Sequence, residues 1–513
     1  MRQIRTQISM VCRMTRTVDA DFLALPLAAL SDAAISTAKN GGASHVDVRI
    51  ERTRTGLLSL RDAKPETQSD ESIIGIGVRV IVDGAWGFAS SPDLSVDTAK
   101  RLANTAVAMA KTSKPLSTEA ISLADEPIHS GKTWVSAYEI DPFSVSDEER
   151  KDRLGSLSAT LLKSDSVNHT SAYMMYVKEQ KYYADSHGTS TTQQRVRMQT
   201  QIEAISIGEH GFESIRTLAQ PAGYGWEWMR GDIWDWDREI AQLPELLAEK
   251  VKAPSVTPGR YDLLIHPSNL WLTIHESIGH ATELDRAIGY EANYAGTSFA
   301  TPDKLNKLKY GSPLMNVTGD RLTEHGLSTV GWDDEGVAAQ KWDIVKDGIL
   351  VGYQLDRRIA ARVNRDRSNG CAFADSPAHV PIQRMPNVSL QPNPSGPTLE
   401  KLIESVDDGI YILGDKSWSI DMQRYNFQFT GQQFHRIKNG KLVGQLKDVA
   451  YQATTTDFWG AMKAVGGPST YVLGGAFNCG KAQPGQVAAV SHGCPAAVFE
   501  KINILNTVAE AGI

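Results

Sequence analysis

Two histidines and a glutamate in one short segment carry the clearest chemical signal of the sequence. His275, Glu276 and His280 form the motif HExxxH, with the two histidines five positions apart. In the common zinc motif HExxH they are four apart, which places both imidazoles on one face of a helix. Five positions on a regular α-helix leave the side chains roughly 140° apart. Both can therefore bind one ion only if the helix widens into a π-type turn around Ser277 to Gly279, where glycine tolerates unusual backbone angles.

Glu276 directly follows the first histidine, where its carboxylate would face a metal-bound water without binding the ion. Zinc lowers the pKa of such a water towards 7, and a neighbouring carboxylate can accept its proton. The motif thus predicts metal-assisted hydrolysis with Glu276 as the general base. The competing interpretation is that these three side chains lie on a helix and bind no metal.

A third ligand must come from elsewhere, and three residues could supply it. Glu283 lies three positions after His280, Cys479 lies in a glycine-rich stretch, and Cys494 lies in the segment His492-Gly493-Cys494-Pro495. Two imidazoles and a thiolate suit zinc, although a lone cysteine is more often an inert buried thiol. These residues alone leave the choice open.

The histidines fall on a helix expected from Leu270 to about Leu284, after a strand at 261–265 and a helix-start signal at His266 to Asn269. Beyond residue 330 the chain is dominated by strands and tight turns. Alternating aromatics at 425, 427 and 429 indicate a packed sheet face. The expected turns are Asp347-Gly348, Asn439-Gly440 and Asp407-Asp408-Gly409.

The first half of the chain mixes helices and hairpins. Helical spacing extends from Asp21, which can cap it, to about Lys39, and a half-buried strand follows at 46–51. Asp83-Gly84 separates two strands of a hairpin, and Ser95 caps another helix. Four tryptophans between 221 and 236 favour packing over a stacking platform for bases or sugars. The fold class predicted is α+β.

A proline-bearing stretch at 253–259 is the expected domain boundary. We therefore predict a flexible extension at 1–20, an N-terminal mixed α/β domain at 21–253, and a C-terminal domain at 254–513. The C-terminal domain is expected to be mostly antiparallel β and to carry the HExxxH helix.

Length and composition narrow the class of protein. The chain has 513 residues, 41% of them hydrophobic and 22% charged, with a net charge of −7 and four cysteines. These values are typical of a globular protein with reduced thiols and argue against a disulfide framework or a nucleic-acid partner. No apolar run approaches the ~20 residues of a membrane helix, and a signal peptide at the N-terminus is not favoured. We expect a cytoplasmic protein.

Several motifs together resemble the TldD/PmbA family of metallopeptidases. They are HESIGHATELD from His275, RMPN from Arg384, DDGIYI from Asp407 and FNCGKAQPGQ from Phe477, and the hairpin 75–89 is similar to the family's N-terminal domain. The resemblance covers nearly the whole chain after residue 20. It implies Zn²⁺ bound by His275, His280 and Cys479, with Glu276 catalytic and Glu283 supporting the ligands or packing the helix. The segment of His492 and Cys494 is a departure from the family pattern.

The resemblance further implies a peptidase that acts on short or unfolded peptides and works as a dimer, either with itself or with a TldD/PmbA paralogue. A donor to the tetrahedral oxyanion is also needed, and Arg384, His492 and Tyr294 are candidates. The alternative function is a non-catalytic peptide-binding subunit of a heterodimer. A dinucleotide-binding loop at Gly75-Ile76-Gly77 is not favoured, because the segment lies within a hairpin and has no third glycine.

Overall fold

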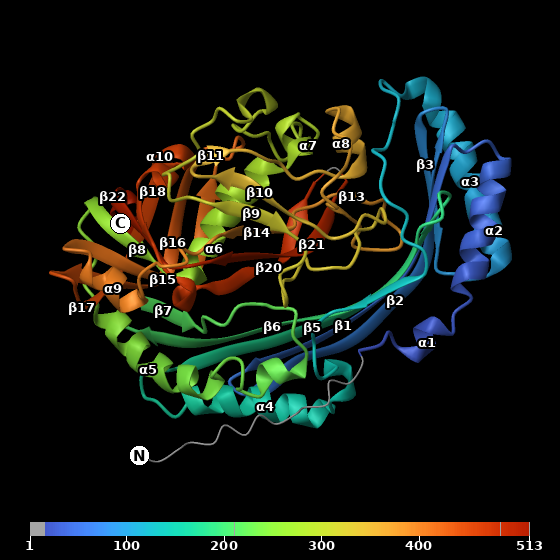
Figure 1. Ribbon diagram of the computed structural model, residues 1–513. Helices are drawn as coiled ribbons and strands as arrows, with labels where there is room; N and C mark the ends of the chain where they lie inside the picture. Colours follow the sequence, from blue (N-terminus) through green and yellow to red (C-terminus); the bar gives the residue numbers. More distant parts are fainter. Residues whose placement is uncertain (1–15, 210, 483, 512–513) are drawn as a thin grey trace, which may run out of the picture.

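The computed structural model describes residues 16–209, 211–482 and 484–511 and contains two large sheets with helices around them (Figure 1). The α+β prediction is confirmed, with a mixed α/β N-terminal part and a β-rich C-terminal part. The two large sheets share no strand, and the chain passes from one to the other between α5 (Trp236–Lys252) and β8 (Gly259–Ile265).

The first sheet is built from unusually long strands in the order β3-β2-β1-β5-β6-β4, with β7 paired to β6. All pairings are antiparallel except that of β4 with β6. The predicted hairpin is confirmed, because Asp83 and Gly84 adopt φ angles of 49° and 75° between its strands. The strands are β1 (His45–Arg61), β2 (Lys64–Val82), β3 (Ala85–Ser91), β4 (Lys132–Val135), β5 (His169–Asp185), β6 (Ser190–Gly208) and β7 (Gly211–Arg216).

Four helices cover the outer face of this curved sheet, and the C-terminal domain lies against the opposite face (Figure 1). They are α2 (Leu27–Asn40) and α3 (Val96–Ser113) at one end and α4 (Asp147–Leu161) and α5 at the other. The Ser95 cap is confirmed, since its hydroxyl accepts from the Thr98 N–H. Trp226, Trp228 and Trp236 are buried in the core beneath α4 and α5, so the packing interpretation of these tryptophans is confirmed.

The helix predicted from Asp21 to Lys39 is interrupted. The structure has α1 (Ala20–Leu23), a break at Ala24 to Pro26, and then α2. Proline lacks an N–H, and its ring disfavours the helical conformation of the preceding residue, which explains the break. The predicted cap at Asp21 is wrong, because Asp21 lies inside α1.

By length and composition alone, the segment Ala20–Asn40 could cross a membrane. In the structure Phe22, Leu30, Ala34 and Ala38 of this segment are fully buried in the core formed with β1, β2 and α3. The absence of a membrane span stays a prediction. Residues 1–15 of the predicted N-terminal extension lie outside the described residues, whereas Val18 is buried and the carboxylate of Asp19 accepts from Lys178.

The C-terminal domain is built around the order β15-β8-β22-β18-β16-β17, with β19 on β22, and only β8 and β15 pair in parallel. The turn predicted at Asp407-Asp408-Gly409 is wrong, because Gly409 lies within β15 beside Asp262 of β8. The turns at Asp347-Gly348 and Asn439-Gly440 are confirmed. The strands of this sheet are β15 (Asp408–Ile420), β16 (Asn426–Lys438), β17 (Lys441–Leu446), β18 (Val449–Thr454), β19 (Met462–Val465) and β22 (Ala497–Asn506).

Smaller elements complete this domain. One small sheet has the order β11-β10-β9-β14, and two strand pairs join β12 to β13 and β20 to β21. Their bounds are β9 (Val317–Asp320), β10 (Lys341–Lys346), β11 (Ile349–Leu350), β12 (Ala372–Phe373), β13 (Ile382–Gln383), β14 (Asn387–Leu390), β20 (Val472–Lys481) and β21 (Gln486–Cys494). The helices are α6 (Pro267–Ile274), α7 (Leu284–Ala287), α8 (Arg357–Arg362), α9 (Leu399–Glu404), α10 (Thr455–Gly460) and α11 (Thr507–Glu510).

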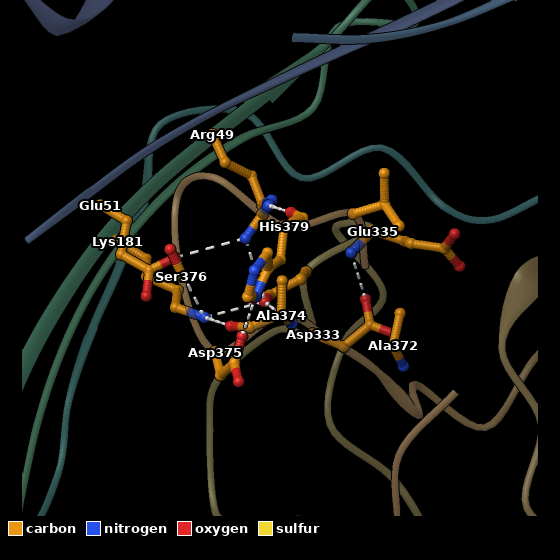
Figure 2. A network of polar contacts seen from close by, with 12 residues as sticks. Arg49, Glu51, Lys181, Asp333, Glu335, Ala372, Ala374, Asp375, Ser376 and His379 are labelled. Carbon is orange, nitrogen blue, oxygen red and sulfur yellow. Dashed lines mark hydrogen bonds and ion pairs between the residues drawn. The ribbon is translucent and has the colours of Figure 1, made fainter. Parts of the chain in front are cut away.

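Charged side chains join the two domains. The strand predicted at 46–51 as half-buried is buried on both faces, because the C-terminal domain covers the side that carries Arg49 and Glu51. Figure 2 shows these residues and Lys181 meeting loops of the C-terminal domain. Lys181 Nζ lies 2.8 Å from Asp334 Oδ2, and Arg49 donates to the carbonyl of His379. The interface is therefore held by buried ion pairs and hydrogen bonds.

Candidate metal centre

The helix that carries the histidines widens where the spacing demands it. The α-helix α6 ends at Ile274, residues His275–Gly279 form a π-helical turn, and the His280 N–H donates to the His275 carbonyl. Neighbouring side chains bond the carbonyls of the turn. Tyr310 donates to the Ser277 carbonyl, and Gln354 donates to the Gly279 carbonyl at 2.6 Å. The predicted π-type widening is confirmed, and it places both imidazoles on one side of the helix.

Gly279 has a different role from the one predicted. Its φ is −52°, which is ordinary helical backbone that any residue can adopt. A Cβ at this position would instead lie 2.6 Å from Sδ of the fully buried Met385. Glycine at this position therefore accommodates the close approach of the Met385 side chain and not an unusual backbone angle.

His275, His280 and Cys479 come together at this turn. One ligand atom from each lies within 4.8 Å of the others, and all three residues are buried. The distance from His280 Nε2 to Cys479 Sγ is 3.7 Å. Tetrahedral zinc with ordinary bond lengths separates a nitrogen and a sulfur ligand by about 3.5 Å. The donor set thus fits a zinc ion, while the role of these residues as ligands stays a prediction.

Cys479 reaches the histidines from β20, whose pairing with β21 is irregular between Ala476 and Cys479. Arg384 fixes the backbone here by donating to the Cys479 carbonyl. Burial acts to raise the pKa of the Cys479 thiol, but His280 and Arg384 outweigh it and hold the pKa below its ordinary value. The thiol is thereby biased towards the thiolate that binds metal.

Cys494 lies apart from the histidines. Its thiol donates to the Pro267 carbonyl at 3.8 Å, at the start of α6, and burial raises its pKa. Its environment is that of a structural thiol. The structure therefore brings Cys479, and not Cys494, to the HExxxH turn.

Each of the two histidines of the motif has a hydrogen-bond partner at its Nδ1 nitrogen. His280 Nδ1 lies 2.8 Å from Glu283 Oε2. Glu283 therefore contacts a proposed ligand and is not itself one of the three grouped residues, His275, His280 and Cys479. Lys481 Nζ lies 3.2 Å from the other Glu283 oxygen. His275 Nδ1 lies 2.7 Å from His492 Nε2. Such contacts orient ligand rings in metal sites.

Glu276 lines a cleft of about 480 Å³ between the two domains. One wall comes from β5, β6 and the segment 216–221, and the other from α6, β15 and β20. Arg424 donates to Glu276 Oε2 at 2.7 Å. Burial acts to raise the pKa of the Glu276 carboxyl, but His280, His275 and Arg424 lower it below its ordinary value. These neighbours therefore favour the ionised form of Glu276, which can accept a proton.

The three oxyanion donors proposed from the sequence do not line this cleft. Arg384 bonds the carbonyls of Gln486 and Cys479, His492 bonds His275, and Tyr294 is 70% exposed. The cation beside Glu276 is instead Arg424. The sequence contains no local signal for this contact, because it joins residues 148 positions apart.

Comparisons with known proteins match this chain to metallopeptidases, which agrees with a metal centre at the HExxxH turn. Residues 46–110 match the model of PmbA/TldA metallopeptidase domain 1, and residues 258–506 match the C-terminal domain of the same family. A metalloprotease of Methanocaldococcus jannaschii is 27% identical over 82% of this chain and 89% of its own length. A zinc metalloprotease TldD homolog of Saccharolobus solfataricus is 21% identical over 92% of this chain and 98% of its own.

Solved structures share the fold. TldE from Thermococcus kodakarensis superposes with a TM-score of 0.70 at 15% identity, covering 93% of this chain and 99% of its own. A Thermotoga maritima protein gives a TM-score of 0.73 at 16% identity over the same shares. The match therefore extends through both domains.

Proposed function

Because the chain belongs to the PmbA/TldD family of metallopeptidases, we propose that it is a zinc-dependent peptidase that hydrolyses short or unfolded peptides. One observation carries the proposal. The buried donors of His275, His280 and Cys479 converge beside the carboxylate of Glu276, at the wall of a cleft between two domains. A merely structural zinc site has no need of an adjacent ionised carboxylate or of an open cleft.

The residues divide the chemistry between them. His275, His280 and Cys479 would hold the zinc ion, which when bound would polarise the scissile carbonyl and activate water. Glu276 accepts a proton from that water and then delivers it to the departing amine. Arg424 holds the Glu276 carboxylate in place through a hydrogen bond of 2.7 Å to Oε2. Side chains of both domains line the cleft in which these residues lie.

The shape of the cleft favours an extended peptide. Among the described strands, β20 pairs only with β21, and its residues 475–480 line the cleft. A peptide can add to such an edge as a further strand and bond main chain to main chain. A folded protein would not enter a cleft of about 480 Å³ between two domains.

We further propose that the protein works in the cytoplasm as a dimer, with itself or with a TldD/PmbA paralogue, and without nucleic acid or membrane. Sedimentation of the purified chain, alone and with a co-expressed paralogue, measures this assembly. A fully active monomer at working concentration would contradict the dimer.

The change Glu276→Gln tests the mechanism. Because Glu276 is assigned proton transfer and not ligation, the variant should keep its zinc and lose peptide cleavage by roughly 10²–10⁴-fold. Zinc content and cleavage of an unfolded peptide are measured together, with Glu400→Gln on the exposed face of α9 as the matched control.

Near-normal cleavage by zinc-loaded Glu276→Gln would contradict the mechanism. Zinc binding without cleavage by the wild type, alone and with a paralogue, would favour the alternative of a non-catalytic peptide-binding subunit.

A further inference from the structure

A short chain of hydrogen bonds ends on His275. His492 Nδ1 lies 2.8 Å from the carbonyl oxygen of Val388, and His492 Nε2 lies 2.7 Å from His275 Nδ1. His492 and Val388 are completely buried, and His275 is 5% exposed. Val388 lies on β14, His492 lies on β21, and His275 lies in the π-turn.

The chemistry of these groups fixes where the hydrogens lie. A carbonyl oxygen only accepts, so the Nδ1 of His492 must carry a hydrogen and donate it. A neutral imidazole has one N–H, so Nε2 of His492 is a bare acceptor. His275 must then donate from Nδ1, which leaves its Nε2 with a free lone pair. That tautomer is the one able to bind a metal through Nε2.

We propose that His492 is a positioning residue that sets the tautomer and ring orientation of His275 for metal binding through Nε2. The proposal rests on the assignment of His275 as a ligand in the proposed function. The ring of Trp271 lies nearly parallel to that of His492, at 10°, with centroids 6.3 Å apart.

This arrangement makes the two histidines unequal. The partner of His280 is the carboxylate of Glu283. The partner of His275 is the imidazole of His492, whose Nδ1 in turn bonds the Val388 carbonyl. A carboxylate raises the basicity of the imidazole that it supports more than a neutral acceptor does. Nε2 of His275 is therefore the less basic metal ligand of the two histidines, and His275 depends on His492 mainly for the orientation of its ring.

Two substitutions separate positioning from packing. His492→Leu fills the space without an acceptor, and His492→Gln offers an amide oxygen near the position of Nε2. The Leu variant should bind zinc about 10–100-fold more weakly than the wild type, the usual effect of losing such a contact. The Gln variant should stay within a few-fold. Zinc affinity is measured by competition with a chelator, with His169→Leu on the half-exposed end of β5 as control.

The tautomer gives a readout that does not depend on zinc or activity. In metal-free wild type, nitrogen-15 spectra of labelled histidine should show His275 protonated on Nδ1, its signal being the one absent from His275→Gln. His492→Leu should give a mixture of tautomers.

Protonation of His275 on Nε2 in metal-free wild type, or wild-type zinc affinity in a folded Leu variant, would overturn the proposal. If the Leu variant does not fold, the wild-type spectrum and the Gln variant still decide. Failure of the wild type to bind zinc would instead overturn the proposed function, while the tautomer measurement would remain a separate result.

Discussion

The contact between Gly279 and Met385 makes a quantitative prediction about the π-turn. In Gly279→Ala the new Cβ would lie 2.6 Å from Met385 Sδ and 2.9 Å from its Cε, both shorter than real carbon contacts. The clash is with the flexible end of a methionine, but Met385 is completely buried, so any shift of its side chain has to be taken up by neighbours in the core. Overpacking of this kind costs about 1–3 kcal/mol.

Two effects oppose each other in this substitution. Alanine is the better helix former by about 1 kcal/mol, so subtracting this gain leaves an expected net destabilisation of about 0–2 kcal/mol. For a domain of this size, that corresponds to a fall in melting temperature of up to roughly 8 °C. Scanning calorimetry measures it. Gly155 in α4 is the matched control, because the nearest atom to its Cβ would be 3.8 Å away. Gly155→Ala should therefore be neutral or stabilising.

A second variant identifies the cause. In a Met385→Ala background the clash is absent, so adding Gly279→Ala should no longer destabilise the protein. Gly279→Ala that melts above the wild-type temperature would refute the reasoning, as would an equal loss of stability in both backgrounds.

Two further predictions concern single side chains. Cys479→Ser should weaken zinc binding sharply, because a neutral hydroxyl replaces a thiolate, whereas Cys494→Ser should leave zinc affinity unchanged; zinc titration of both variants checks this. Burial acts to raise the pKa of Asp47, but Arg79 and His45 lower it to about 2 in the folded protein. Because this value lies below that of an unfolded aspartate, about 3.9, the stabilisation is present above pH 4 and lost as the pH falls towards 2. Asp47→Asn should therefore be less stable at pH 7 by about 2–3 kcal/mol and show a smaller loss on acidification, measured by melting curves across this range.

Local constraints made part of the site predictable from the sequence. Binding of one ion by both His275 and His280 requires a π-turn at their spacing, whatever the rest of the fold, and the structure contains that turn. The Asp83-Gly84 hairpin is likewise fixed by dihedral preferences within a few residues. The break before α2 also had a local signal in Pro26, but the helical periodicity on both sides concealed it.

Features that depend on distant segments were not predictable. From the residue types alone the choice between Cys479 and Cys494 stayed open, because it depends on which thiol the strand pair β20–β21 brings to the HExxxH turn; only the resemblance to the family indicated Cys479. The position of Arg424 depends on where the turn between β15 and β16 meets the HExxxH turn. The strand at 46–51 looked half-buried because alternation reports only which residues are apolar, and Arg49 and Glu51 are buried by the other domain.

The charged inner face of the first sheet also bears on synthesis at the ribosome. In the finished protein this face is buried, yet it presents ionisable side chains where a sheet interface would ordinarily be apolar. The residues concerned are Arg49, Glu51, Glu179, Lys181, Arg195 and Arg197. At about 5–20 residues per second, residues 254–513 take roughly 10–50 s to emerge after the first domain. During that interval water can hydrate the charged inner face of the sheet. The nascent first domain therefore does not expose the aggregation-prone surface that an apolar interface would present.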